Sequence, residues 1–260
     1  MLRKKKFDYT FNDLKNALQE LELKEGDNLF IHSNVGFFGV LQNANSAEDY
    51  YNIFKTAIFD VISKQGTLVM PTFTYSFCWN QVYDKNVSPS LCGLLAEQMR
   101  MDPEAIRSED ANFSIIAIGK LAEEFTQDPP EYSFGPNSFW EKFLNNDGIF
   151  VNFNFDAGST FIHYVERTLQ VPYRWDKPFP GTSIINGEPR EGLFYHYVYD
   201  LENPDHEPNF PKFHKKAVEE GLVKKVNLGR GQIISITSRD TFNLIRKVIK
   251  KDPSFLIGKL

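Results

Sequence analysis

The segment formed by residues 149–177 constrains the fold more strongly than any other part of the chain. Residues 149–155 are rich in aromatic and β-branched side chains, which predicts a strand. The strand ends near Gly158, where glycine tolerates the backbone angles of a tight turn, and Ser159 or Thr160 can then cap a helix. A strand that turns directly into a helix is typical of open α/β sheets, which place their ligand sites at such turns.

His163 is the residue of this predicted helix that points to chemistry. It lies in the first turn, and Glu166 follows on the same helix face. The positive end of the helix dipole disfavours an imidazolium there, so His163 should stay neutral, as a general base requires. The alternative is an ordinary helix histidine with a satisfied hydrogen bond, and position alone does not decide between the two.

Capping residues, apolar patterns and turn residues predict the secondary structure of the rest of the chain. Helices are predicted over residues 10–23, 46–64, 91–101, 138–144, 210–220 and 238–251. Strands are predicted over residues 28–32, 67–70, 113–118, 194–199, 223–228 and 232–236, whereas residues 178–189 are turn-rich and residues 72–90 form a long aromatic loop. We therefore expect a single α/β domain over residues 1–260, with a central mixed, largely parallel sheet flanked by helices and antiparallel strands in its C-terminal part.

The composition is that of an ordinary globular protein, with 42% hydrophobic and 24% charged residues. The formal net charge of -5 provides no basic field for a nucleic acid polymer. Cys78 and Cys92 are too few for a disulfide framework, and neither they nor the five histidines have metal-ligand spacing, so no metal is expected. Two cysteines are usual for a protein of the reducing cytoplasm, so a cytoplasmic location is expected. Membrane insertion is not expected, because no uncharged apolar run is long enough to span a bilayer.

Five short motifs follow one another along the chain. They are His32-Ser33 with Gly39, the Gly-Thr-Leu-Val-Met-Pro-Thr-Phe-Thr run at residues 66–74, Arg107-Ser108 with Ser114, Phe134-Gly135 with Ser138, and Thr160, His163 and Glu166 followed by Tyr173-Arg174. In this order they resemble the aminoglycoside 3-N-acetyltransferase family, and the resemblance extends over about residues 10–245. Each motif alone is weak, but the ordered set is specific.

The resemblance implies an acyl-CoA-dependent N-acyltransferase, with coenzyme A as the acyl donor and direct attack by the acceptor amine. His163 would be the general base and Glu166 its catalytic partner. A base with a pKa near neutrality suits the removal of a proton from an amine. Glu166, Asp176 or Asp200 could fix the tautomer of the histidine, and the sequence does not choose among these acids.

The resemblance also indicates where coenzyme A would bind. Glycine turns in the loop at residues 33–39 free backbone N–H groups that can hold phosphate oxygens, and Arg107 is a candidate for another phosphate contact. Without the resemblance, a plain glycine-rich turn and a surface salt bridge remain as alternatives for this loop and this arginine. The cofactor-binding residues predicted in this way are Ser33, Asn34, Val35, Gly36, Phe37, Gly39, Thr74, Arg107, Ser108 and Ser114.

The acceptor is predicted from departures and from aromatic residues. Asp110 and Ala111 stand where the family has His and Pro, which bears on the substrate more than on the reaction. The aromatic loop and the Tyr-Arg-Trp run suit a nucleobase or sugar ring. We therefore expect a small nucleotide-linked (dTDP- or UDP-) amino sugar of bacterial surface polysaccharide, as in lipopolysaccharide biosynthesis. The predicted substrate-binding residues are Tyr75, Trp79, Tyr173, Arg174 and Trp175.

Other readings remain at this point. The acidic loop between Asp200 and Glu207 could line a pocket for a polycation, which favours an aminoglycoside 3-N-acetyltransferase that confers antibiotic resistance. A cysteine-dependent acyltransferase or hydrolase and a non-catalytic sugar-binding module belong to other classes. The sequence leaves open which amino sugar is bound, the acyl chain length and the oligomeric state, although an oligomer is compatible with it.

Overall fold

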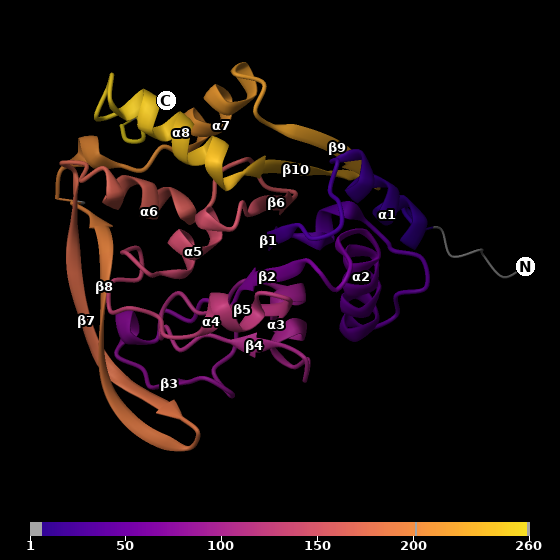
Figure 1. Cartoon of the computed structure of the whole chain (residues 1–260), viewed down its shortest axis with the longest axis horizontal. Coiled ribbons are helices and arrows are strands. Elements are labelled where there is room, and N and C mark those ends of the chain that lie inside the picture. Colours follow the sequence, from indigo (N-terminus) through magenta and orange to yellow (C-terminus); the bar gives the residue numbers. More distant parts are fainter. Residues whose placement is uncertain (1–6, 201, 259–260) are drawn as a thin grey trace, which may run out of the picture.

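A seven-stranded mixed sheet forms the centre of the protein in the computed structural model, which describes residues 7–200 and 202–258 (Figure 1). The strand order is β4-β5-β2-β1-β6-β10-β9. The bounds of these strands are β1 Asn28–Ser33, β2 Thr67–Pro71, β4 Ile106–Arg107, β5 Ile115–Gly119, β6 Ile149–Phe153, β9 Lys224–Leu228 and β10 Gly231–Thr237.

Parallel pairing is confined to the middle of this sheet. β1 runs parallel to β2 on one side and to β6 on the other, with Leu29 opposite both Leu68 and Ile149. These strands are covered on both faces, which explains their nearly continuous apolar runs. β5, β4, β10 and β9 are antiparallel to their neighbours. The expected α/β class and mixed sheet are confirmed, but the parallel part is limited to the three central strands.

Helices cover both faces of the sheet. Their bounds are α1 Phe11–Glu20, α2 Ala47–Ile62, α3 Leu94–Arg100, α4 Ala122–Thr126, α5 Phe139–Asn145, α6 Phe161–Thr168, α7 Phe210–Glu219 and α8 Ser238–Ile249, with short 3-10 turns η1 Val35–Phe38, η2 Phe77–Trp79 and η3 Pro204–His206. The capping boxes expected from Thr10 with Asp13 and Ser46 with Asp49 begin α1 and α2. Among the described residues, no helix is long and apolar enough to cross a bilayer.

Strand alternation divides the apolar side chains between two cores. Phe30 and Phe150 point to one face, where they pack with residues of α5, α6 and α8. Leu29 and Val151 point to the other face, which α1, α2 and α3 cover. Figure 1 shows these two groups of helices on opposite sides of the strands. The high phenylalanine content therefore serves largely to fill the cores.

A long antiparallel hairpin forms a second sheet with the short strand β3 (Tyr83–Asp84). Its strands are β7 (Arg174–Ile185) and β8 (Glu188–Tyr199), and in Figure 1 they run along one side of the molecule. The prediction of a turn-rich segment at residues 178–189 is wrong. The prolines of β7 lie before the short stretch that pairs with β3, where the strand is an edge and needs no amide donor. The turn itself, Asn186-Gly187, has φ values of 54° and 83°, which favours a tight hairpin.

We expect Phe150→Ala to destabilise the fold by about 3–5 kcal/mol, because it opens a cavity where the strands meet α5 and α6. The Phe150 ring is fully buried, and its centroid lies 5.2 Å from those of Phe143 and Phe161. The measurement is urea unfolding. Val218→Ala, on the exposed face of α7, is the control and should change the unfolding free energy by no more than about 0.5 kcal/mol. Equal effects of the two substitutions would contradict this account of the core.

Candidate active site

The carboxyl ends of β1 and β2 open onto a cavity of about 420 Å³. His32, Ser33 and Asn34 line it from the end of β1, and Thr160 lines it from the start of α6. Phe73, Leu91 and Phe155 are among the residues that form its apolar walls. This is the edge of an open sheet at which ligands usually bind, and it lies one helical turn from His163.

His32 is held at this cavity in one tautomer. Its Nδ1 lies 3.0 Å from Oδ1 of Asn152 on the neighbouring strand β6. The Nδ2 group of Asn152 donates to the carbonyls of Asp156 and Gly158, which leaves Oδ1 as the acceptor. His32 therefore donates through Nδ1 and keeps the lone pair on Nε2. Burial lowers the pKa of His32 to about 4, so the ring is neutral at pH 7.

His163 and Glu166 form a second, tighter group with Arg174. The Glu166 carboxylate is fully buried, and its Oε1 accepts a hydrogen bond of 2.8 Å from the Tyr173 hydroxyl. Arg174 Nη2 lies 2.9 Å from Glu166 Oε2 and 2.6 Å from His163 Nδ1. The contact with Glu166 is an ion pair rather than an aligned hydrogen bond, since Oε2 accepts none from the described residues. Arg174 thus lies between the acid and the histidine.

This arrangement sets the tautomer of His163. A guanidinium only donates, so Nδ1 must accept from Arg174 and the ring proton must lie on Nε2. Burial and the charge of Arg174 lower the pKa of His163 to about 4, against the opposing effect of Glu166. Glu166 Oε2 is 3.6 Å from Nδ1, whereas Asp176 is paired with Arg167 and Asp200 lies near His206. Of the three acids that the sequence left open, Glu166 is the one beside His163.

A sequence profile of the family described as aminoglycoside 3-N-acetyltransferase matches residues 30–250, which is most of the chain. The chain belongs to this family. It is 25% identical over 193 residues to the SPbeta prophage-derived aminoglycoside N(3')-acetyltransferase-like protein YokD of Bacillus subtilis, covering 65% of this chain and 68% of that protein. It is 23% identical over 201 residues to aminoglycoside N(3)-acetyltransferase IX of Micromonospora chalcea, covering 69% of each.

Solved structures agree with the fold of this aminoglycoside 3-N-acetyltransferase family member. The apoenzyme of AAC(3)-IVa superposes with a TM-score of 0.79 at 21% identity, covering 98% of this chain and 93% of that chain. AAC-IIIb, solved as a binary complex with CoASH, gives a TM-score of 0.80 at 18% identity, covering 96% and 98%. The family predicted from the motifs is therefore confirmed, and it is a family of acyl-CoA-dependent N-acetyltransferases.

The expectation of a nucleotide-linked amino sugar as acceptor is wrong. The relatives matched in sequence are named for aminoglycoside acetylation, and solved neighbours include complexes of AAC(3)-IVa with a gentamicin and with apramycin. That expectation also required Tyr173, Arg174 and Trp175 to form one exposed stacking surface, which they do not. Tyr173 and Arg174 are almost fully buried around Glu166, while Trp175 points to the opposite side of β7, as strand alternation requires.

Tyr75 and Trp79, the other predicted substrate-binding residues, lie in the loop after β2. Their ring centroids are 5.8 Å apart, and Tyr75 also packs edge-on against Phe73 and Phe113. Trp79 is 55% exposed. These aromatic residues pack mainly on one another, so their number alone was a poor indicator of a stacked ligand.

The predicted cofactor residues fall into two groups. Ser33 and Asn34 line the cavity, and Val35, Gly36 and Phe37 form the 3-10 turn that follows. A Cβ added to Gly36 would meet only the Asn34 side chain, at 3.9 Å, whereas Gly39 has φ +87° and packs against Asp8. Of the predicted residues in this loop, Ser33 and Asn34 line the cavity, while Val35, Gly36, Phe37 and Gly39 follow them along the chain and are not among its lining residues.

The remaining four, Thr74, Arg107, Ser108 and Ser114, are buried in a structural network. Arg107 donates to the carbonyls of Thr72, Lys85 and Ser88, and its Nε lies near two hydroxyls. The other three side chains bond to the backbone of the same region. Because these donors are already used, we no longer assign Arg107 to a phosphate. Asp110 is likewise structural, since its Oδ1 accepts from the amides of Asn112 and Phe113.

The structure brings together three polar residues, Cys78, His196 and Asn112, that no sequence pattern offered a reason to group. Cys78 Sγ lies 3.6 Å from His196 Nδ1, and His196 Nε2 lies 2.9 Å from Asn112 Nδ2. Asn112 Oδ1 accepts from the Cys78 amide, so Nδ2 donates to His196 and the imidazole proton lies on Nδ1, toward the thiol. Burial raises the pKa of Cys78 to about 11. Burial therefore favours the protonated thiol at neutral pH. No local sequence signal joins residues so far apart.

We expect the stability of this protein to rise with pH between about 4 and 6.5, because its buried histidines are neutral in the fold and charged in the unfolded chain. Burial lowers the pKa of His196 to about 3. His196→Gln should therefore reduce the slope of unfolding free energy against pH by up to about 1.4 kcal/mol per pH unit. Urea unfolding at pH 5, 6 and 7.5 measures both slopes. Identical slopes below pH 6.5 would show that His196 is charged in the fold.

Proposed function

We propose that this chain transfers the acetyl group of acetyl-CoA to an amine of an aminoglycoside. The observation that carries the proposal is the match of residues 30–250 to the aminoglycoside 3-N-acetyltransferase family. The geometry supports it in three ways: a cavity that suits the donor, acidic residues beside His163 that suit a cationic acceptor, and a neutral histidine between them.

The lining of the cavity suits the acyl end of coenzyme A. It is bounded by apolar side chains and by the polar groups of Ser33, Asn34 and Thr160. When bound, acetyl-CoA supplies an acyl thioester, and this chain's residues hold it and receive the acceptor.

A loop rich in carboxylates connects two of the aromatic residues that contact His163. Tyr199 at the end of β8 and Phe210 at the start of α7 pack against its ring, with centroids at 6.4 and 5.6 Å. The loop between these two contacts carries four acidic side chains, namely Asp200, Glu202, Asp205 and Glu207. Among the described residues, Glu202, Asp205 and Glu207 form no salt bridge. An acidic loop next to the base suits the several ammonium groups of an aminoglycoside.

His163 would take the proton that the attacking amine loses. In the resting arrangement its Nε2 carries a proton, because Arg174 donates to Nδ1. To accept at Nε2, the ring must hold its proton on Nδ1 and direct it to Glu166 Oε2, so Arg174 must first withdraw toward Glu166. The low pKa of His163 keeps the ring uncharged at neutral pH, so its lone pair is available. The N–H groups of the attacking amine become much more acidic as its nitrogen bonds to the acetyl carbon, so even this weak base can take the proton. The protonated thiol of Cys78 agrees with direct transfer rather than an acyl-cysteine route.

We expect His163→Asn to lower kcat by on the order of 10²–10⁴, because asparagine keeps an N–H donor but cannot take up a proton. The KM for acetyl-CoA should change little, since the residue does not line the donor cavity. Steady-state kinetics on folded variant measure both constants. A variant that kept wild-type kcat would show that His163 acts only as a donor, or not at all.

The acceptor assignment is tested by thiol release from acetyl-CoA. We expect turnover with gentamicin and apramycin and none with dTDP- or UDP-linked amino sugars. The KM for the aminoglycoside should rise steeply with ionic strength, because the acidic loop binds it by charge. A variant with Glu202→Gln and Glu207→Gln removes two of these charges. It should raise the KM for the aminoglycoside and weaken the dependence of that KM on salt, while the KM for acetyl-CoA, the internal control, stays unchanged. Turnover of none of these amines would overturn the proposal and favour a sugar-binding module.

A further inference from the structure

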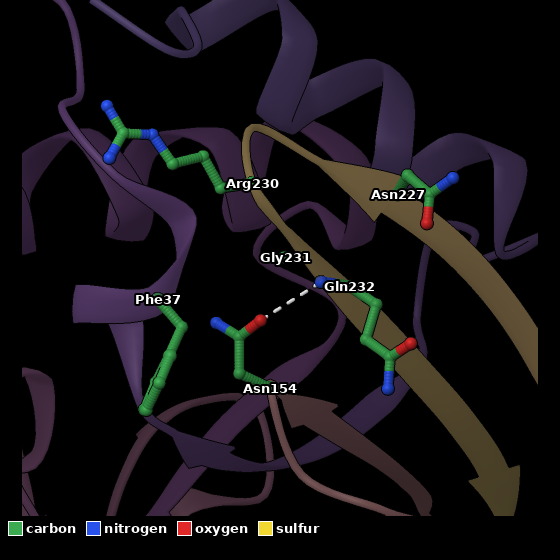
Figure 2. A pocket seen from close by; sticks show the side chains of 6 residues that line it. All are labelled: Phe37, Asn154, Asn227, Arg230, Gly231 and Gln232. Carbon is green, nitrogen blue, oxygen red and sulfur yellow. Dashed lines mark hydrogen bonds between the residues drawn. The ribbon is translucent and has the colours of Figure 1, made fainter.

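Two further hollows have linings distinct from that of the donor cavity. The smaller, of about 360 Å³, is lined by Phe37, Asn154, Asn227, Arg230, Gly231 and Gln232 (Figure 2). Because Phe37 belongs to the loop after β1, this hollow shares that loop with the proposed donor site. The larger, of about 800 Å³, is within the size range of small-molecule sites and is built from other elements.

The larger hollow lies at the end of the sheet opposite to the donor cavity. Ile118, Gly119 and Lys120 line it from the end of β5. β5 is antiparallel to β2, so Gly119 lies opposite Thr67, the first residue of β2, whereas the donor cavity opens at the other end of that strand. The larger hollow and the donor cavity share no lining residue. A ligand in the larger hollow would therefore not take part in the proposed acetyl transfer.

One face of α2 forms a long wall of this hollow. Its lining residues recur at the spacing of a single helix face and are Asn52, Lys55, Thr56, Phe59 and Asp60. Since a helix rises about 1.5 Å per residue, they extend over about 12 Å. Half-buried Phe59 and buried Ile118 belong to the same core beneath α2, so they give the hollow an apolar base.

Most charges in this lining are already paired. Asp60 pairs with Lys15 at 2.8 Å, and Lys55 pairs with Asp102 at 2.7 Å and with Glu104. These pairs also connect α2 to α1 and to the turn before β4, which holds the wall in place. They provide no free cation for a ligand.

Lys64 and Lys120 are the exceptions. Both line the hollow, and neither ammonium group has a salt bridge or hydrogen bond to any residue that the structure describes. The Lys120 amide donates to the Gly66 carbonyl at 3.1 Å, and Lys64 precedes Gly66 by two residues. The two unpaired lysines therefore lie at the same end of the hollow.

The open edge of β5 adds a backbone donor at this end. β4 pairs with Ile116 and Ala117 of β5 and does not reach Gly119. The Ile115 carbonyl accepts from the Ser108 amide on the β4 side, and strand alternation directs the N–H and C=O of Gly119 to that same side. The Gly119 amide thus faces no partner strand where it lines the hollow.

We propose that this hollow binds a linear aliphatic carboxylate, with its alkyl chain along α2 and its carboxylate at the end formed by Lys64 and Lys120. Charge complementarity selects the anion, because two unpaired ammonium groups and an open amide suit an oxyanion. The Phe59 ring and the methylene stems of the lysines suit an alkyl chain. This site is independent of the proposed acetyl transfer.

The test uses calorimetric titrations with decanoate below its micellar concentration. Lys64→Gln combined with Lys120→Gln should weaken decanoate binding by about two- to tenfold, the range expected for exposed ion pairs. Lys250→Gln combined with Lys251→Gln is the matched control, because these lysines are also exposed and also without a salt bridge to a described residue. The control should leave the affinity unchanged. Equal losses in the two double variants, no loss in the first, or no binding to the unmodified protein would overturn the proposal.

The alkyl chain is tested at Thr56, an exposed lining residue of α2. Thr56→Glu and Thr56→Gln add similar bulk, but only glutamate places a charge against the chain, so it should weaken decanoate by about threefold or more relative to glutamine. Octanoate should bind the unmodified protein about two- to fourfold more weakly per missing methylene. Equal affinities of the two Thr56 variants, or of the two acids, would overturn the placement of the chain along α2.

Competition distinguishes this site from the donor cavity, which is also partly apolar. Coenzyme A should not displace decanoate, and decanoate should shift the amide resonance of Gly119 with or without coenzyme A present. Displacement by coenzyme A, or no shift at Gly119, would place decanoate elsewhere and overturn the proposal. These measurements contain no acceptor, so absence of aminoglycoside turnover would count against the proposed function alone.

Discussion

The buried carboxylate of Glu166 is the group on which the arrangement of the site depends. It is fully buried, and an unpaired charge in such a place would cost several kcal/mol. Arg174 supplies the opposite charge and Tyr173 a hydrogen bond, and both residues come from the start of β7 rather than from α6. The ion pair therefore fixes the hairpin to the helix that carries His163. The same guanidinium stacks on the Tyr199 ring, with 3.6 Å from its carbon to the centroid, which also holds the end of β8 beside the histidine.

Local signals predicted the strands of the sheet other than β4 and the flanking helices other than α4, because their causes are local. The capping pairs at the starts of α1 and α2 and the apolar runs of β1, β2 and β6 are each visible within a few residues of sequence. β7 could not be found in this way. Its proline-containing stretch looks like a loop, and its stability comes from pairing along its length with β8, which no short window reveals. Only the Asn186-Gly187 turn was a usable signal for this hairpin.

The site was predictable in its chemistry but not in its contacts. The placement of His163 and Glu166 on one face of α6 follows from helical spacing. That Arg174 would lie between them does not, since it depends on the alternation of β7 and on how the hairpin packs. The same limit applies to Arg107, whose motif suggested a phosphate contact but whose donors hold the backbone around residues 72 and 85–88. A family motif can mark a structural network as well as a ligand site.

Charge bears on the proposed aminoglycoside acceptor more directly than the aromatic residues do. Aromatic side chains of the loop after β2 gain most by packing on one another, and most of them do so. A cationic acceptor needs an uncharged base and nearby carboxylates, because an imidazolium would repel it. Burial and Arg174 keep His163 neutral, and Glu166 cancels the charge of Arg174, so this group presents no net charge to the acceptor. The loop between Tyr199 and Phe210 would then bring negative charge to this side of the site, which suits the proposed aminoglycoside better than an anionic nucleotide sugar.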